Sequence, residues 1–211
     1  MKANDGKDDW PNLCRYRADD MQLASGPAKV REVVFMGDSI TEAWQIAHPA
    51  FFTDGRVDRG VSGQTTPQML VRFEQDVVGL HPRAVHILGG TNDIAGNTGP
   101  NAFDDYKNHI VAMVTLAKAA HIRVILASVP PAAKFPWAPN LAPAPQIQMI
   151  NAWLKNYARR ERLIYVDYYS VLATSDGGMR PELTLDGVHP NTDGYKVMEP
   201  LTRKAIAEAM R

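Results

Sequence analysis

The stretch VVFMGDSITEAW, residues 33–44, decides how this chain folds. Its first four residues form an apolar run rich in β-branched and aromatic side chains, and Gly37, Asp38 and Ser39 follow directly. A short apolar run that ends in small and polar residues is typical of a buried strand leading into a turn. We therefore expect Ser39 to lie where a buried strand ends and a helix begins.

The same alternation continues along the chain. Short β-prone runs are separated by longer segments with apolar residues at helical spacing, and this order predicts an α/β fold in which a five-stranded parallel sheet carries helices on both faces. The predicted strands are Val33 to Met36, Val57 to Val61, Ala84 to Leu88, Val124 to Ser128 and Leu163 to Val166. Predicted helices begin at Thr66, contain the stripes starting at Phe103 and Ile147, and follow Asn191.

Length and composition indicate one globular domain. The chain has 211 residues, with 23 basic and 23 acidic ones. Its net charge is therefore zero, and no overall electrostatic attraction favours binding to nucleic acid or to an anionic membrane. Residues 1–30 are predicted to be an N-terminal extension packed on a domain of residues 31–211. A lone Cys14 cannot form an internal disulfide, and no apolar run is long enough to span a membrane. We expect a soluble protein; its compartment stays open, including export with a leader already removed.

Four polar clusters follow the predicted strands or precede the last helix: MGDSIT at 36–41, GVSGQTT at 60–66, GGTND at 89–93 and DGVHP at 186–190. Ligands of open parallel sheets bind at the carboxyl ends of the strands, so we expect these clusters to converge. A serine hydroxyl needs a neighbouring base to become a nucleophile, and that base needs an orienting group. Ser39, His189 and Asp186 fit these roles in ester hydrolysis. The N–H groups of Ser39 and Gly63 and the amide of Asn92 are candidate oxyanion donors.

These four clusters resemble, in the same order, the blocks of the SGNH hydrolases, also called the GDSL esterases. The resemblance covers residues 33 to about 210 and is closest to the branch of platelet-activating-factor acetylhydrolase-like and carbohydrate acetylesterase-like enzymes. It implies a three-layer, flavodoxin-like α/β/α fold and a reaction that uses no cofactor and no metal. It also implies Ser39 as nucleophile, His189 as general base and acid, Asp186 as its orienting group, and Gly63 and Asn92 as oxyanion donors.

Few residues are left over for a lid or a deep acyl tunnel, so we expect short acyl groups, acetyl above all, on a small alcohol or a sugar. Trp44, Phe135 and Trp137 are candidate substrate-binding residues, and the alternative is that the tryptophans only pin their loops to the body. The main alternative substrate is a longer acyl chain, as in a lysophospholipase or thioesterase. Asp38, Ser62 and Asp93 are expected to shape the loops by hydrogen bonds.

Two other classes of protein share part of this pattern. In a metallophosphoesterase, Asp38, Asn92 and His189 would bind metal, but the chain has neither an Asp-x-His pair near its start nor a late His-x-His. A carbohydrate-binding module would use the aromatic residues alone, and the complete set of catalytic residues argues against it. Oligomeric state is left open by the sequence.

Overall fold

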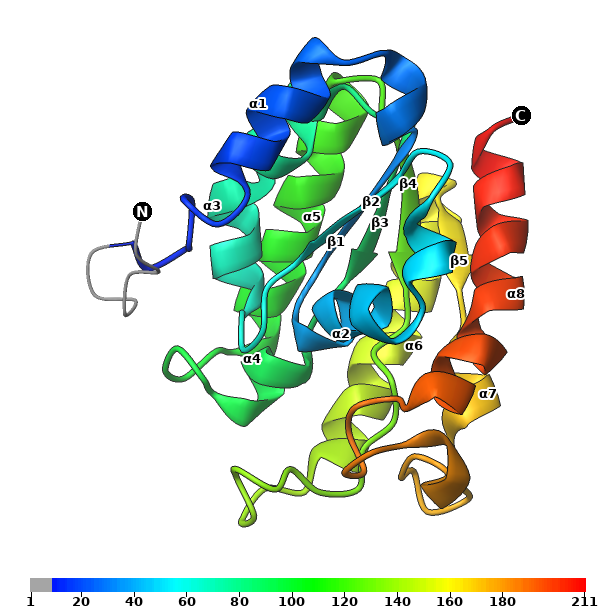
Figure 1. Ribbon diagram of the computed structural model, residues 1–211. Coiled ribbons are helices and arrows are strands. Elements are labelled where there is room, and N and C mark those ends of the chain that lie inside the picture. The colour runs from blue at the N-terminus through cyan, green and yellow to red at the C-terminus, as the bar shows by residue number, and fades with distance from the viewer. Residues whose placement is uncertain (1–8) are drawn as a thin grey trace.

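The computed structural model describes residues 9–211 and has a parallel five-stranded sheet with the strand order β2-β1-β3-β4-β5 (Figure 1). Each predicted strand is present, and no strand end differs from its predicted position by more than one residue. The strands are β1 (Val33–Gly37), β2 (Arg56–Gly60), β3 (Ala84–Leu88), β4 (Arg123–Ala127) and β5 (Ile164–Val166). The predicted three-layer α/β/α fold is confirmed.

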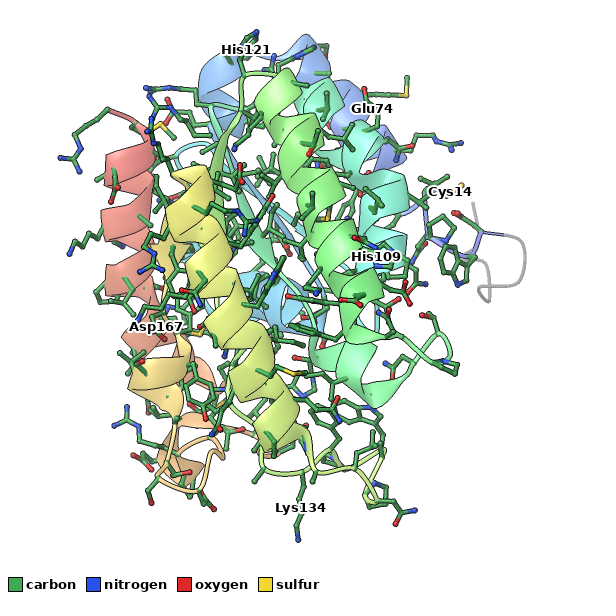
Figure 2. All side chains as sticks on the ribbon, turned by 180° about the vertical axis from the view of Figure 1, so that it is seen from behind. Cys14, Glu74, His109, His121, Lys134 and Asp167 are labelled. Carbon is green, nitrogen blue, oxygen red and sulfur yellow. The ribbon has the colours of Figure 1, made fainter. Side chains whose placement is uncertain are left out.

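Helices cover both faces of the sheet. The α-helices are α1 (Arg17–Ser25), α2 (Ser39–Ala47), α3 (Thr66–Asp76), α4 (Thr91–Ala95), α5 (Phe103–Ala119), α6 (Pro143–Glu161), α7 (Tyr169–Leu172) and α8 (Thr192–Ala209). Short 3₁₀ turns are η1 (Ala28–Arg31), η2 (Pro49–Phe52), η3 (Val78–Leu80) and η4 (Pro181–Leu183). Helices α3, α5 and α6 lie on one face, and α2, α7 and α8 on the other (Figure 1). Figure 2 shows α5 and α6 in front when the molecule is seen from behind.

Strand β1 divides its side chains between two apolar layers. Val34 and Met36 pack with α3 and α5, whereas Val33 and Phe35 pack with α2 and α8. Alternate side chains of a strand point to opposite faces, so a sheet covered on both sides needs an unbroken apolar run. This requirement explains why all five residues of β1 are buried.

The register of the sheet brings three polar clusters to one edge. Gly37 at the end of β1 is paired with Gly60 of β2 on one side and with Leu88 of β3 on the other. A Cβ atom at Gly60 would lie 2.2 Å from the backbone nitrogen of Glu42, so glycine allows α2 to cross close over the strand end. The residues that follow β1, β2 and β3 therefore emerge side by side.

The described part of the N-terminal region contacts β2 and α3. Arg59 forms ion pairs with Asp19 at 2.6 Å and Asp20 at 2.7 Å, and the hydroxyl of Tyr16 donates to the carbonyl of Gly60. The division of the chain into residues 1–30 and 31–211 stays a prediction, because residues 1–8 lie outside the described part. Among the described residues, no helix is long and apolar enough to cross a membrane.

Candidate active site

Ser39 is the first residue of α2, and its hydroxyl is not used to cap that helix. Asp38 is the N-cap instead, and its carboxylate accepts the backbone N–H of Ile40 at 2.9 Å. Capping by the preceding residue leaves the Ser39 hydroxyl available for other partners. It also places the N–H of Ser39 among the unpaired donors of the first helical turn.

His189 and Asp186 complete a line of hydrogen bonds from Ser39. The Ser39 Oγ lies 2.9 Å from His189 Nε2, and His189 Nδ1 lies 2.8 Å from Asp186 Oδ2. Residues 184–190 precede α8, which packs beside α2, so a contact between residues 150 positions apart follows from the helix packing. The structure therefore brings together the three residues that the sequence predicted as nucleophile, base and orienting group.

The carboxylate of Asp186 is held in place by the loop that carries His189. Asp186 Oδ1 accepts the backbone N–H of Val188 at 2.9 Å and that of His189 at 2.8 Å. Partial burial raises the pKa of Asp186, but these hydrogen bonds and that of the His189 ring outweigh it, so the pKa lies below its ordinary value. Asp186 is thus a carboxylate at neutral pH and can orient the imidazole.

Asn92 is fixed by three polar neighbours. Its Nδ2 donates to the backbone oxygen of Gln64 at 3.0 Å and lies 3.4 Å from Asp38 Oδ2, while its Oδ1 accepts Asn97 Nδ2 at 2.8 Å. Asn97 also donates to the carbonyl of Gly63 at 3.3 Å, so it links two of the candidate oxyanion donors. Gly63 has a positive φ of 79°, a conformation that glycine adopts without strain.

Two side chains that the sequence analysis did not single out hold the loop after β2. Glu42 on α2 accepts the backbone N–H of Ser62 at 2.9 Å and also its hydroxyl, and it pairs with Arg15 at 2.5 Å. Arg72 on α3 is fully buried and donates to Gln64 Oε1 at 2.6 Å. The contacts of Glu42 join distant parts of the chain, so no local pattern marks this residue.

Arg72 also ties the loop to the strand ends. It donates to the carbonyl of Gly37 at 2.9 Å and to that of Arg59 at 2.7 Å, and it pairs with Asp76 at 2.7 Å. A buried guanidinium with all these partners is well satisfied, and it fixes the ends of β1 and β2 relative to each other.

Asp38 and Asp93 are buried beside the site and, as expected, accept hydrogen bonds from backbone N–H groups. Asp93 accepts the N–H of Thr66 at 3.1 Å and also its hydroxyl, and Thr65 is the N-cap residue of α3. Complete burial raises the pKa of Asp38 to about 7, and burial also raises that of Asp93. Ser62 is occupied by Glu42, which agrees with its predicted part in shaping the loop.

The prediction that Trp44 contacts substrate is wrong, because its side chain is completely buried. It stacks on Phe51 at 4.9 Å between ring centroids and on Tyr195 at 5.4 Å. Its spacing of four from Ile40, which is also buried, is the sequence signal that both residues share the core face of one helix.

Phe135 is also buried, but it supports a residue that is not. Its ring stacks on Trp137 at 5.2 Å with an interplanar angle of 8°, and Trp137 is 43% exposed with its ring centroid 6.0 Å from that of His189. Phe135 also lines a cavity of about 470 Å³ that borders the site at Asp186 and Gly187. Residues 128–145, which include six prolines, therefore reach the site, and Figure 2 shows Lys134 of this segment pointing outward at this end of the molecule.

Comparisons with known proteins identify the family of this chain. Residues 35–197 match the model of the GDSL-like lipase/acylhydrolase family, and the chain belongs to this family. The hydrolase class follows from that membership. Among curated proteins, no match to this chain is found.

Solved structures include two with high similarity over nearly the whole chain. One is assigned as an acylhydrolase from Bacteroides fragilis, with 48% identity and a TM-score of 0.92 over 96% of this chain and 99% of that one. Another is a GDSL-like lipase from Bacteroides thetaiotaomicron, with 45% identity and a TM-score of 0.91 over 95% of this chain and 100% of the lipase chain. An acetylxylan esterase from Geobacillus stearothermophilus shares the fold at 19% identity, with a TM-score of 0.64 over 83% of this chain and 94% of the esterase chain.

A metal centre was the alternative use of the polar clusters. Within residues 9–211, no group of three or more His, Cys, Asp or Glu side chains is arranged to hold a metal ion. Asp38 and Asn92 are instead engaged with the backbone of Ile40 and Gln64. His189 is engaged with Ser39 and Asp186.

Proposed function

We propose that this protein is a serine esterase that hydrolyses short-chain carboxylic esters through an acyl-enzyme. The observation that carries the proposal is the continuous line of hydrogen bonds from Ser39 through His189 to Asp186. Ser39 Oγ attacks the ester carbonyl while His189 Nε2 takes its proton, and the imidazolium then protonates the leaving alcohol. Water, activated by the same histidine, attacks the acyl-enzyme and restores Ser39.

The negative charge that develops on the carbonyl oxygen requires donors that are already in place. The N–H groups of Ser39 and Gly63 and the Nδ2 of Asn92 supply them in this proposal. Asn97, Gln64 and Glu42 hold these donors through the contacts described above. Asp186 keeps the imidazole in the tautomer that can accept a proton at Nε2.

We infer the preference for short acyl groups from the position of the cavity, which lies on the alcohol side of the site and not on the acyl side. The leaving alcohol must receive its proton from His189, so it lies on the side of that ring. Trp137 and the cavity of about 470 Å³ are on this side, which assigns the space to the alcohol. An acetylxylan esterase has the same fold, so acetylated sugars are the first natural esters to test.

A longer acyl chain is the second candidate, and the chemistry of the same cavity favours it. Its lining includes Phe135, Pro136, Pro139, Met179 and Pro181, which together form an apolar surface. A fatty acyl chain bound there would make the protein a lysophospholipase or a thioesterase.

Hydrolysis of p-nitrophenyl esters from acetate to palmitate separates the two candidates. We expect kcat/KM to fall steeply beyond butyrate and Ser39→Ala to abolish turnover, with Ser62→Ala as the matched serine control that keeps turnover. A maximum at long chains would select the second candidate. Turnover that survives Ser39→Ala would contradict the proposed mechanism.

A further inference from the structure

The two exposed tryptophans lie on different sides of the candidate active site. Trp10 is 45% exposed and Trp137 is 43% exposed, whereas Trp44 is buried and Trp153 is half-buried. Trp137 lies beside His189, and Trp10 lines a separate cavity of about 500 Å³ that also contains Gly63 and Asn97. One tryptophan is therefore next to the base, and the other is next to the loop of the oxyanion donors.

Among the residues that the structure describes, the lining of the cavity at Trp10 is polar and includes no basic side chain. Besides Trp10, its lining is made of amide and hydroxyl side chains, one valine, one glycine and Asp9. Both carboxylate oxygens of Asp9 are already used, since they accept the backbone N–H groups of Leu13 and Cys14 at 2.8 Å each. A phosphate or another anion would require cationic partners, so the lining favours a neutral, hydroxylated ligand.

The N-terminal wall of this cavity is fixed to the body of the protein. Gln68 Nε2 donates to the carbonyl of Trp10, and Gln64 Nε2 donates to the carbonyl of Pro11, each at 2.7 Å. Gln64 is also the residue whose own carbonyl accepts the amide of Asn92. A wall held in this way is preorganised, so little ordering cost opposes binding against it.

We propose that the natural substrate is an oligosaccharide that bears its ester group on an internal sugar unit and extends across the site from Trp137 to Trp10. This inference rests on the proposed function. The esterified unit places its carbonyl at Ser39 and its alcohol oxygen at His189, next to Trp137. A neighbouring unit stacks its apolar face on the indole of Trp10 and directs its hydroxyls to side chains such as those of Asn12 and Thr98.

The test compares p-nitrophenyl acetate with partially acetylated xylooligosaccharides of increasing length. In Trp10→Ala, we expect the ratio of kcat/KM on the longer oligomers to kcat/KM on p-nitrophenyl acetate to fall about tenfold, because binding energy from a remote unit is lost. Trp10→Phe keeps an aromatic face and should restore most of the ratio. Met21→Ala removes another exposed apolar side chain of the N-terminal region, outside the cavity, and should leave the ratio unchanged.

Two results would overturn the inference: a Trp10→Ala ratio equal to that of the wild type, or a loss that is the same on p-nitrophenyl acetate as on the oligomers. Ser39→Ala is measured in the same series. If that variant still hydrolyses p-nitrophenyl acetate, the proposed function itself fails, and this outcome is distinct from a failure at Trp10.

Discussion

At the scale of the residue, the amide of Asn92 is held in a fixed orientation, as its proposed role of oxyanion donor requires. Its oxygen is occupied by Asn97, and its nitrogen donates to the carbonyl of Gln64. A primary amide nitrogen carries two hydrogens, and the one that Gln64 does not accept makes only a long contact of 3.4 Å to Asp38 Oδ2. A negative oxygen in the site would replace this weak contact, while Gln64 and Asn97 keep the amide in its orientation.

Asn92→Ala should therefore lower kcat by about a hundredfold or more, with a much smaller change in KM, because the lost interaction is made chiefly in the transition state. Steady-state kinetics on p-nitrophenyl acetate measure both constants. Asn97→Ala keeps the amide of Asn92 but removes the hydrogen bond that orients it, so this variant should lower kcat less than Asn92→Ala does. Near wild-type kcat in Asn92→Ala would remove Asn92 from the set of oxyanion donors.

At the scale of the element, α2 joins the proposed nucleophile to the loop that carries Gly63. The first turn of the helix contains both Ser39 and Glu42, and the carboxylate of Glu42 accepts the N–H of the residue before Gly63. A shift of this loop by a fraction of an ångström would displace the N–H of Gly63 from the oxygen that it stabilises in the proposed mechanism. We therefore propose Glu42 as a positioning residue.

We expect Glu42→Ala to lower kcat by roughly tenfold while KM changes little, since an oxyanion donor is misplaced rather than removed. Glu42→Gln retains one acceptor oxygen, so its kcat should lie between that of Glu42→Ala and that of the wild type. Arg15→Ala removes only the exposed partner of Glu42 and should stay close to wild type. Equal kinetics for Glu42→Ala and the wild type would show that the loop holds its position without this contact.

The elements were predictable because each strand is a continuous apolar run that ends in small or polar residues. The same logic gave Ser39 and Asn92, since parallel strands deliver their ends to one edge. Asp186 and His189 precede the last helix instead, and they were predicted because a serine nucleophile requires a base and an orienting group. The prediction for Trp44 was wrong because the sequence does not show how closely α8 covers α2, and this packing buries Trp44 against Tyr195. Glu42 was missed for a related reason, because its partners Arg15 and Ser62 are distant in sequence. Arg72 has a local partner in Asp76, but its bonds to the carbonyls at the ends of β1 and β2 depend on the tertiary fold.

At the scale of the whole molecule, several carboxyl groups are buried, among them Asp20 in α1, Asp38 at the start of α2 and Asp58 in β2. Burial raises the pKa of Asp38 and that of Asp58 to about 7 each, and it raises that of Asp20 to about 6 against the opposing charge of Arg59. The folded protein therefore holds these protons at a pH where the unfolded chain has released them. Such groups stabilise the fold below their unfolded pKa, and this stability is lost as pH rises through the folded pKa.

Burial lowers the pKa of His86 to about 3, so this one group adds stability as pH rises toward 6.5, against the three aspartates that lose it. The melting temperature should accordingly fall by several degrees between about pH 5 and pH 8. Carboxylates with lowered pKa, such as Asp186, lose their contribution only below their ordinary range and do not affect this window. Asp58→Asn keeps an acceptor for the N–H of Gly60 without a titrating proton, so its melting curve should depend less steeply on pH. Thermal denaturation at constant ionic strength measures the effect, and a melting temperature that rises toward pH 8 would contradict it.

Ser39 as the nucleophile is the central claim, and covalent labelling tests it most directly. Diethyl p-nitrophenyl phosphate phosphorylates activated serines, and trypsin then releases Ser39 in the segment 32–56 and Ser62 in the segment 60–72. We expect one equivalent of label on Ser39, found by mass spectrometry, in step with the loss of esterase activity. Label on Ser62, or full inactivation with Ser39 unmodified, would contradict the assignment.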